Sequence, residues 1–236
     1  MARQQTFFVS GKLENIIFYN FRGTPFARTM PVRVRQTKAT KNSAALFGLA
    51  ARTGRLIREG LYPLYHDLTD PTIMQRLNSA LIKCLNAYGI PKQPPLENLS
   101  FLTGFVFHDA ATFYSRFKKK LQLAPDRRGV GVTIPKLNPV KDISAPAHTK
   151  TVILKLGAVA CNLDKTLTAD QVQREITIPY IDINRPAQTA ELSVPVAKNQ
   201  LVVIAAALRY IKGTNMESEE RRWMPVEVVG TYWSGS

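Results

Sequence analysis

The sequence predicts an α+β protein: a basic N-terminal β-hairpin arm and two or three helices, followed by a C-terminal antiparallel β-sandwich of the immunoglobulin-like type. Three observations lead to this prediction. Residues 6–36 are apolar and punctuated by turn residues, and residues 39–58 and 71–88 carry apolar side chains at helical spacing. From residue 150 onward, β-branched and aromatic runs alternate with turns at intervals that suit a sandwich.

Residues 124–149 have the composition of a linker. They contain four prolines, at positions 125, 135, 139 and 146, and proline interrupts both helices and inner strands. We therefore expect three parts: residues 1–123 as basic arm plus helical region, 124–149 as linker, and 150–236 as β-sandwich domain.

The charge is concentrated at one end of the chain. The 236 residues are 45% hydrophobic, enough for a folded core, and carry a net charge of +15. Residues 1–58 hold eleven Lys and Arg against one acid, Glu14, so +10 of the +15 lies in this quarter. Such a field favours anionic partners, which include nucleic acid, anionic lipid and acidic protein, although an inert basic surface is the alternative.

Nothing in the sequence resembles a targeting or membrane segment. The first 20 residues lack the apolar run of a secretory signal, and no later stretch reaches the length of about 18 apolar residues that a spanning helix needs. Cys84 and Cys161 lie too far apart for a disulfide framework or a clustered metal site, so we expect two packed, reduced thiols. We expect the protein to be cytoplasmic, or released without a classical signal peptide.

The arm is predicted to be a hairpin with limbs at 13–21 and 26–35 around Arg22-Gly23-Thr24. Pro25 and Pro31 place the second limb at a sheet edge, because proline lacks the N–H that a strand donates to its neighbour. A two-stranded ribbon cannot cover its own apolar side chains. The candidates for self-association are Phe7, Phe8, Leu13, Ile16, Ile17, Phe18 and Phe21. The arm either joins a neighbouring copy of the chain or packs on the chain's own helices.

A cationic stripe is predicted on the helix that follows. Lys38, Lys41, Arg52 and Arg55 fall within an arc of about 100° when residues are placed at helical spacing. A solvated charged face without a partner is the alternative. The candidate residues for binding a polyanion or for an interface are Arg28, Arg33, Arg35, Lys38, Lys41, Arg52, Arg55 and Arg58.

The rest of the chain is predicted element by element. Asp70-Pro71 begins a helix over 71–88, residues 101–107 form a short strand, and Asp109 caps a helix over 110–121. The strands of the sandwich are expected at 151–156, 175–183, 190–196, 201–210 and 224–233. Residues 201–208 are uninterrupted apolar sequence and should be the central strand.

No pattern of a catalytic, metal or cofactor site is present in the sequence. His66, His108 and His148 lie in no ligand-type or nucleophile pairing, and we expect each to be a surface or capping residue. Gly129-Val130-Gly131 lacks the context of a phosphate-binding loop. The sequence therefore disfavours an enzyme, although a site assembled from scattered residues is a third possibility.

A set of motifs lies in order along about the first 120 residues. It consists of Gly11-Lys12, Asn15, Phe18-Tyr19, Arg28, Phe47-Gly48, Gly54-Arg55-Leu56-Ile57-Arg58, Leu61-Tyr62-Pro63-Leu64, Arg76-Leu77 and Leu102-Thr103-Gly104-Phe105-Val106-Phe107. This order resembles that of a family of uncharacterised basic proteins from Bacteroidota bacteria. Where that family has Asn after Gly-Phe-x-Phe, this chain has His108. The resemblance implies a bacterial source and no activity, cofactor or ligand.

Two functions are consistent with these features. The first is a non-enzymatic structural protein that self-associates into an oligomer or filament through its arm and β-domain, since an apolar arm with edge-strand character can add to the open edge of another subunit's sheet. The second is a sequence-independent nucleic-acid-binding or packaging protein that uses the basic stripe. The expected partners are accordingly copies of the chain, and nucleic acid or another polyanion.

Overall fold

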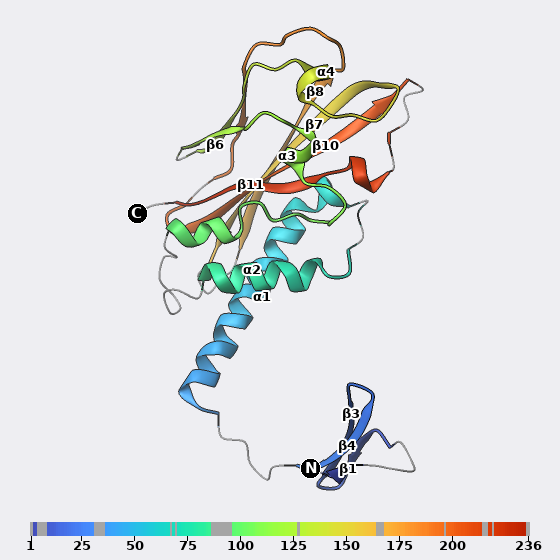
Figure 1. Cartoon of the computed structure of the whole chain (residues 1–236). Helices are drawn as coiled ribbons and strands as arrows, with labels where there is room; N and C mark the ends of the chain where they lie inside the picture. Colours follow the sequence, from blue (N-terminus) through green and yellow to red (C-terminus); the bar gives the residue numbers. More distant parts are fainter. Residues whose placement is uncertain are drawn as a thin grey trace. The chain divides into compact units, whose positions relative to one another are not determined.

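The computed structural model describes residues 2–3, 9–30, 36–66, 68, 70–85, 96–126, 128–163, 168–195, 197–213, 217–218 and 220–234. The chain divides into two compact units, residues 1–41 and 42–236. The predicted combination of helices with antiparallel sheets is confirmed (Figure 1).

A four-stranded antiparallel sheet is the centre of the larger unit. Its strands are β7 (Thr149–Asn162), β8 (Ala169–Pro179), β10 (Gln200–Lys212) and β11 (Val226–Trp233), in the order β11-β10-β7-β8. The prediction that 201–208 lies in an inner strand is confirmed, because β10 pairs with both β7 and β11. The first eleven residues of β10 are all buried.

Both faces of this sheet are covered, which explains the uninterrupted apolar sequence of β10. Leu201, Val203 and Ala205 belong to a cluster that includes helix residues, whereas Val202 and Ile204 belong to a second cluster on the opposite face. Successive side chains of a strand point to opposite faces. A strand buried on both faces therefore lacks the alternation of apolar and polar residues that a half-exposed strand shows.

Helices cover the first face (Figure 1). They are α1 (Lys38–Tyr65), α2 (Ile73–Leu85) and the 3₁₀ helix η2 (Leu96–Phe101). Helix α1 approaches β7 closely: a Cβ at Gly60 would lie 2.5 Å from Val159, and one at Gly157 would lie 3.1 Å from Leu61 and Leu64. This packing extends α1 through Pro63 to Tyr65, well beyond the predicted 39–58, because Leu61 and Leu64 are fully buried.

A three-stranded sheet contributes to the cluster on the second face. It consists of β5 (Gln122–Asp126), β6 (Gly129–Ile134) and β9 (Gln188–Leu192), in the order β5-β6-β9. Val130, Val132 and Ile134 of β6 share this cluster with Val202 of the large sheet.

The residues expected to form a linker, 124–149, therefore belong to the core of the larger unit. They contain most of β5, all of β6 and the short helix α4 (Pro139–Asp142). Two of the prolines lie at the ends of elements: Pro135 directly follows β6, and Pro139 occupies the start of α4, where Asn138 caps the helix and no backbone N–H is needed.

The segment between the helices and β5 also differs from the prediction. No strand forms at 101–107; instead, this segment runs along β11, with Gly104 N donating to Val228 O (2.8 Å) and Phe107 N donating to Val226 O (3.0 Å). The helix expected at 110–121 is only α3 (Phe113–Arg116), and Thr112 caps it in place of Asp109. It stops there because Phe117 pairs with Ile143.

The smaller unit is built on a sheet of its own. The strands are β1 (Ala2–Arg3), β2 (Gly11–Leu13), β3 (Ile16–Phe21) and β4 (Thr24–Thr29), in the order β1-β4-β3-β2. The hairpin β3–β4 lies within the residues predicted for the arm, although a turn at Glu14–Asn15 divides the limb expected at 13–21. Its turn is Arg22–Gly23, both at positive φ (52° and 78°), as a type I′ turn requires.

The position of β4 in the arm sheet differs from the prediction. It is an inner strand rather than an edge strand, because β1 pairs with it at Phe26 and Ala27. Pro25 lies outside that pairing, so its missing N–H is tolerated. Residues 31–35, including Pro31, lie outside the described residues.

Candidate assembly and polyanion-binding surfaces

Among the residues that the structure describes, one face of the arm sheet has no charged side chain. Opposed residues of neighbouring strands share a face, and the register pairs Leu13 with Ile16, Phe18 with Ala27, and Asn20 with Pro25. We call this the uncharged face; it consists of Gly11, Leu13, Ile16, Phe18, Asn20, Pro25, Ala27 and Thr29. A face of this composition is suited to packing against another protein surface.

The opposite face combines aromatic rings with cations. Tyr19 and Phe26 form a cross-strand pair with ring centroids 5.8 Å apart, and the guanidinium carbon of Arg28 lies 5.7 Å from the Tyr19 centroid. We call this the aromatic–cationic face; it consists of Lys12, Ile17, Tyr19, Phe21, Thr24, Phe26 and Arg28, with Arg22 in the adjoining turn.

The seven residues predicted to mediate self-association are therefore divided. Leu13, Ile16 and Phe18 lie on the uncharged face, Ile17 and Phe21 lie on the other, and two more fall outside the described residues. The two outside are Phe7 and Phe8. Neither apolar cluster of the protein includes a described residue from the arm, and the only buried side chain among residues 9–30 is Pro25. Leu13 is 63% exposed and Phe21 is 57% exposed.

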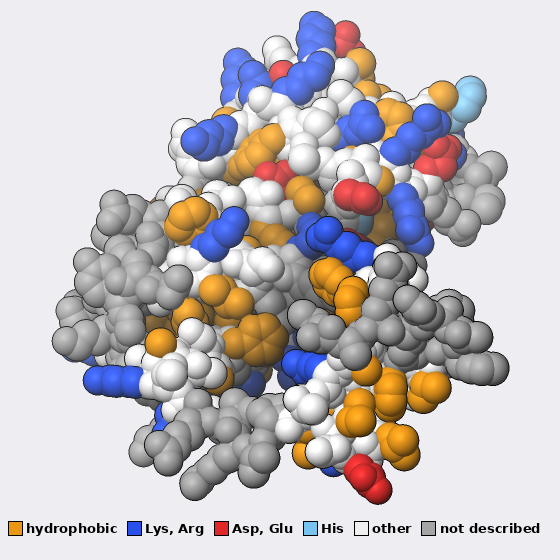
Figure 2. Space-filling view, turned by 60° about the horizontal axis from the view of Figure 1, so that its bottom comes forward, with side chains coloured by type: hydrophobic (Ala, Val, Ile, Leu, Met, Phe, Trp, Pro, Cys, Tyr) orange, Lys and Arg blue, Asp and Glu red, His pale blue; other side chains and the backbone are white. Residues whose placement is uncertain are grey.

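The predicted cationic stripe lies on the part of α1 that faces away from the core. Lys38, Lys41, Arg52 and Arg55 are all exposed, whereas the buried residues of α1 begin only at Leu49. Glu59 is the sole acid within the helix. Figure 2 draws a face of the molecule on which Lys and Arg side chains are interleaved with hydrophobic ones.

The cations on α1 differ in their hydrogen bonds and in their burial. Arg52 donates from Nε to the carbonyl of Gly48 (3.2 Å), and Arg55 pairs with Glu59 at 2.7 Å, a hydrogen bond that raises the pKa of Arg55. Arg58 is half-buried, and its Nη1 is buried without a hydrogen-bond partner among the described residues. Arg58 is therefore set apart from the stripe to which it was assigned.

The remaining candidates of the polyanion set lie in or near the arm. Arg28 is exposed on the aromatic–cationic face. Arg33 and Arg35 lie outside the described residues.

Sequence reasoning missed a buried cation that caps α1. Arg209, on the helix-covered side of β10, is 1% exposed; its Nη2 donates to Leu64 O (2.8 Å), and its Nε pairs with Glu217 at 3.0 Å. The last carbonyls of a helix have no partner within the helix and attract cations. The last turn of α1 has no basic residue of its own, so the sheet supplies one. Only the position of Arg209 in a strand of apolar residues hinted at this role.

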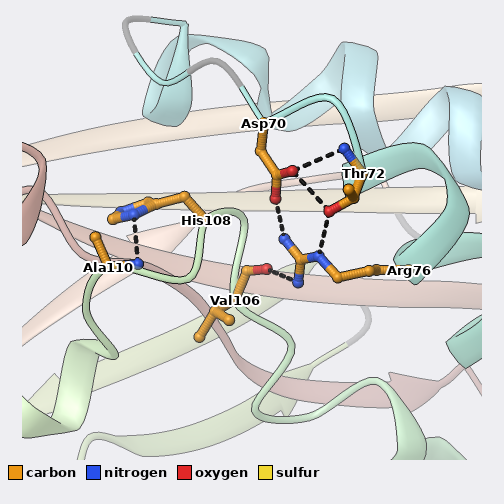
Figure 3. Close-up of polar contacts among 6 residues, drawn as sticks. All are labelled: Asp70, Thr72, Arg76, Val106, His108 and Ala110. Atoms are coloured by element: carbon orange, nitrogen blue, oxygen red, sulfur yellow. Dashed lines mark hydrogen bonds and ion pairs between the residues drawn. The ribbon is translucent and has the colours of Figure 1, made fainter.

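A second polar cluster lies where α2 begins (Figure 3). Arg76 donates from Nη1 to Val106 O (2.9 Å) and from Nε to the hydroxyl of Thr72 (3.2 Å), and it pairs through Nη2 with Asp70. Burial acts to raise the pKa of Asp70, but the hydrogen bonds from Thr72 and Arg76 outweigh it and lower this pKa to about 2. Asp70 thus caps α2, as predicted, and anchors the 104–107 segment through Arg76.

His108, predicted to be a surface or capping residue, is not at the surface but buried, with both ring nitrogens at the backbone. Its Nε2 lies 2.6 Å from Met224 O, and its Nδ1 accepts from Ala110 N (3.2 Å; Figure 3). Burial lowers its pKa, because the imidazolium would lose its hydration. The ring is therefore the neutral tautomer protonated at Nε2, and it joins the backbone at Met224 to the backbone at Ala110.

These polar groups each bond to the backbone: Arg209 to Leu64 O, Arg76 to Val106 O and His108 to Met224 O. Among the described residues no group of three or more His, Cys, Asp or Glu side chains is placed to hold a metal ion. Burial raises the pKa of Cys84 to about 11 and that of Cys161 to about 12, so neither is a reactive thiolate at neutral pH. No described helix is both long enough and apolar enough to cross a bilayer.

Comparison with known proteins adds no relative: no family model, curated protein or solved structure matches the chain. The resemblance to basic proteins of Bacteroidota stays a prediction.

Proposed function

We propose that this protein is a non-enzymatic structural protein that self-associates into an oligomer or filament through its N-terminal arm. The observation that carries the proposal is the uncharged face: three large apolar side chains, Leu13, Ile16 and Phe18, stand on a sheet that contributes no described residue to either core. Burial of each such side chain stabilises an interface by about 1.5–3 kcal/mol.

The receiving surface that we propose is the edge of β8 in another copy. Among the described residues β8 pairs with β7 alone, whereas the other edge strand, β11, is already hydrogen-bonded along its outer side by residues 104–107. An end strand of 11 residues offers a row of backbone donors and acceptors to an added strand. Within the described part of the arm, β2 is an exposed end strand that pairs with β3 alone, so its other edge is the one that we propose to add to β8.

Replacement of apolar side chains on one face of the arm tests the proposal. The variant Leu13→Ser/Ile16→Ser removes apolar surface from the uncharged face, and Phe21→Ser is the matched control on the opposite face. In sedimentation velocity, we expect the wild type and the control to form oligomers and the double variant to sediment as a monomer. Nuclease treatment before each run removes assembly that nucleic acid mediates.

A chain that begins at Lys38 separates this proposal from packing of the arm on its own chain. If the arm serves a neighbour, the shortened protein stays folded by circular dichroism and is monomeric. If the arm completes its own core, the shortened protein unfolds. A full-length protein that is monomeric at every concentration and salt contradicts self-association.

The second candidate function is sequence-independent nucleic-acid binding or packaging through α1. The observation that favours it is the exposed position of Lys38, Lys41, Arg52 and Arg55. Phosphate contacts from such a stripe give an affinity that falls with salt. Filter binding to random-sequence DNA should show this fall, with a smaller slope for Arg52→Ala/Arg55→Ala. Absence of binding at low salt would exclude this function.

We further propose that the four-stranded and three-stranded sheets are the two layers of a β-sandwich. The support is that Val132 and Leu192 of the small sheet share one apolar cluster with Val202 of the large sheet. The immunoglobulin-like variant rests on the spacing of strands in the sequence alone.

A further inference from the structure

We propose that the aromatic–cationic face of the arm sheet is a binding platform for single-stranded nucleic acid. This site is separate from the cationic stripe on α1 and from the uncharged face. The inference does not depend on self-association, because it uses the opposite side of the same sheet.

The aromatic rings supply the stacking surface. Tyr19 and Phe26 are half-buried and stack on one another across the strands (5.8 Å between centroids, 24° between ring planes). Phe21, two residues along β3 on the same face, is 57% exposed. Bases stack on such rings whatever their identity, because every base has a π face.

The cations supply the contacts to phosphate. The guanidinium carbon of Arg28 lies 5.7 Å from the Tyr19 ring centroid, and that of Arg22 lies 5.4 Å from the Phe21 centroid. Lys12, opposite Ile17 in the register, is the third exposed cation of this surface. The one acid among residues 9–30, Glu14, lies in the β2–β3 turn and not on the face.

The backbone at Arg22 supports a role for its side chain. Arg22 has a φ of 52° in the β3–β4 turn. Gly, Asn and Asp are the residues that adopt this conformation with little strain. A bulky residue held at positive φ indicates a function at the site, and here the retained group is the guanidinium beside Phe21.

The combination of rings and cations favours a single strand over the other polyanions. The bases of a duplex are stacked inside the helix and cannot reach Phe21, whereas unpaired bases can. An acidic peptide would use the cations but would leave the rings without a function.

The test uses the full chain and a fluorescein-labelled thymidine oligonucleotide of about 16 nucleotides, the upper range for one binding fold. In fluorescence anisotropy, Phe21→Ala should weaken oligonucleotide binding about tenfold or more and leave the affinity for inorganic polyphosphate unchanged. Arg22→Ala and Arg28→Ala should each weaken the binding of both ligands. Each should also reduce the slope of log affinity against log salt concentration by about 0.7. The control in the larger unit is Phe101→Ala, which removes an aromatic ring that is 50% exposed and lies outside the arm, and it should leave the affinity for both ligands unchanged.

Phe21→Trp provides a direct readout of stacking. The oligonucleotide should quench the fluorescence of the added tryptophan, measured against the wild type with its native Trp223 and Trp233, and polyphosphate should not. Unchanged oligonucleotide affinity in Phe21→Ala, or equal competition by poly-glutamate or by duplex DNA, would overturn the proposal. The assembly proposal is decided separately, by the oligomeric state of the variants on the uncharged face. The nucleic-acid proposal is decided by the variants on the aromatic–cationic face.

Discussion

The two units of the chain use similar strands in different ways. Strand β3 reads Ile-Ile-Phe-Tyr-Asn-Phe, as apolar as most of β10, yet no residue of β3 is buried and the first eleven of β10 are. The large sheet has an apolar cluster on each face, and the arm sheet contributes to neither. The covering layers, and not the strand composition, therefore separate the buried strand β10 from β3, whose residues are partly buried or exposed.

The largest expected difference between the units is in the response to loss of an apolar side chain. Leu61 is fully buried on α1, and its Cδ2 approaches Gly157 of β7. We expect Leu61→Ala to lower the free energy of unfolding by about 2–5 kcal/mol, because a cavity remains where the sheet and helix meet. Urea denaturation followed by circular dichroism measures this.

The matched change in the arm is Leu13→Ala, for which we expect less than about 0.5 kcal/mol in the same experiment, since Leu13 is 63% exposed. Equal losses from both variants would mean that the arm belongs to the same cooperative core.

Removal of the buried cation should have the next largest effect. Arg209→Met keeps much of the volume but leaves Leu64 O and Glu217 without the guanidinium. We expect a loss of about 2–4 kcal/mol, because an unsatisfied buried carbonyl is added to a broken ion pair. Glu217→Gln should be milder, since glutamine keeps an oxygen that can accept from Arg209 Nε and the bond between Arg209 and Leu64 O remains.

Local signals in the sequence were sufficient for several elements. Asp70 beside Pro71 predicted the start of α2, and Arg22-Gly23 between two β-rich runs predicted the β3–β4 turn. The apolar run at 201–208 predicted an inner strand. The start of α2 and the β3–β4 turn are each fixed by interactions within a few residues. The uninterrupted apolar run at 201–208 is the pattern expected of a strand that is buried on both faces.

The features that depend on distant partners could not be predicted. The prolines of 124–149 suggested a linker, but the burial of Val132 and Ile134 depends on a sheet that forms further along the chain. The apolar residues of 16–21 were treated as one set, because their division between two faces requires the register with β2 and β4. Arg209 followed an apolar run, and only the end of α1 explains its burial.

The stability of the larger unit should depend on pH through His108. Its pKa is lowered by burial, so the unfolded chain binds more protons than the folded one as the pH falls below about 6.5. Stability should therefore decrease with falling pH in that range. Replacement by a neutral residue, His108→Gln, should remove this part of the pH dependence at a loss of about 1 kcal/mol near neutral pH, from the weakened bond to Met224 O.

The groups around His108 set the conditions for this measurement. Arg209 and Arg221 lower its pKa further, and Asp109 and the Met224 carbonyl raise it. Glu227 has a raised pKa, chiefly from burial, and its contribution is present at low pH and lost as the pH rises above about 4.5. Comparison of His108→Gln with the wild type at each pH removes this opposing change, because both proteins retain Glu227. An unchanged pH profile in His108→Gln would show that another group titrates.

The smallest expected effect is that of replacing a glycine of α1 by alanine. Gly48 and Gly60 lie on either side of the point where the helix enters the core, so they can be compared. A Cβ at Gly48 meets nothing within 4 Å, whereas one at Gly60 would lie 2.5 Å from Val159 of β7. Gly48→Ala should raise the free energy of unfolding by about 0.5–1 kcal/mol, because alanine favours the helix and nothing opposes it. Gly60→Ala gains the same preference but forces the helix and sheet apart, so we expect no net gain or a loss of up to about 2 kcal/mol. Thermal unfolding of both variants measures the difference between them, and an equal rise for the two would show that α1 does not approach β7 as closely as Gly60 and Val159 indicate.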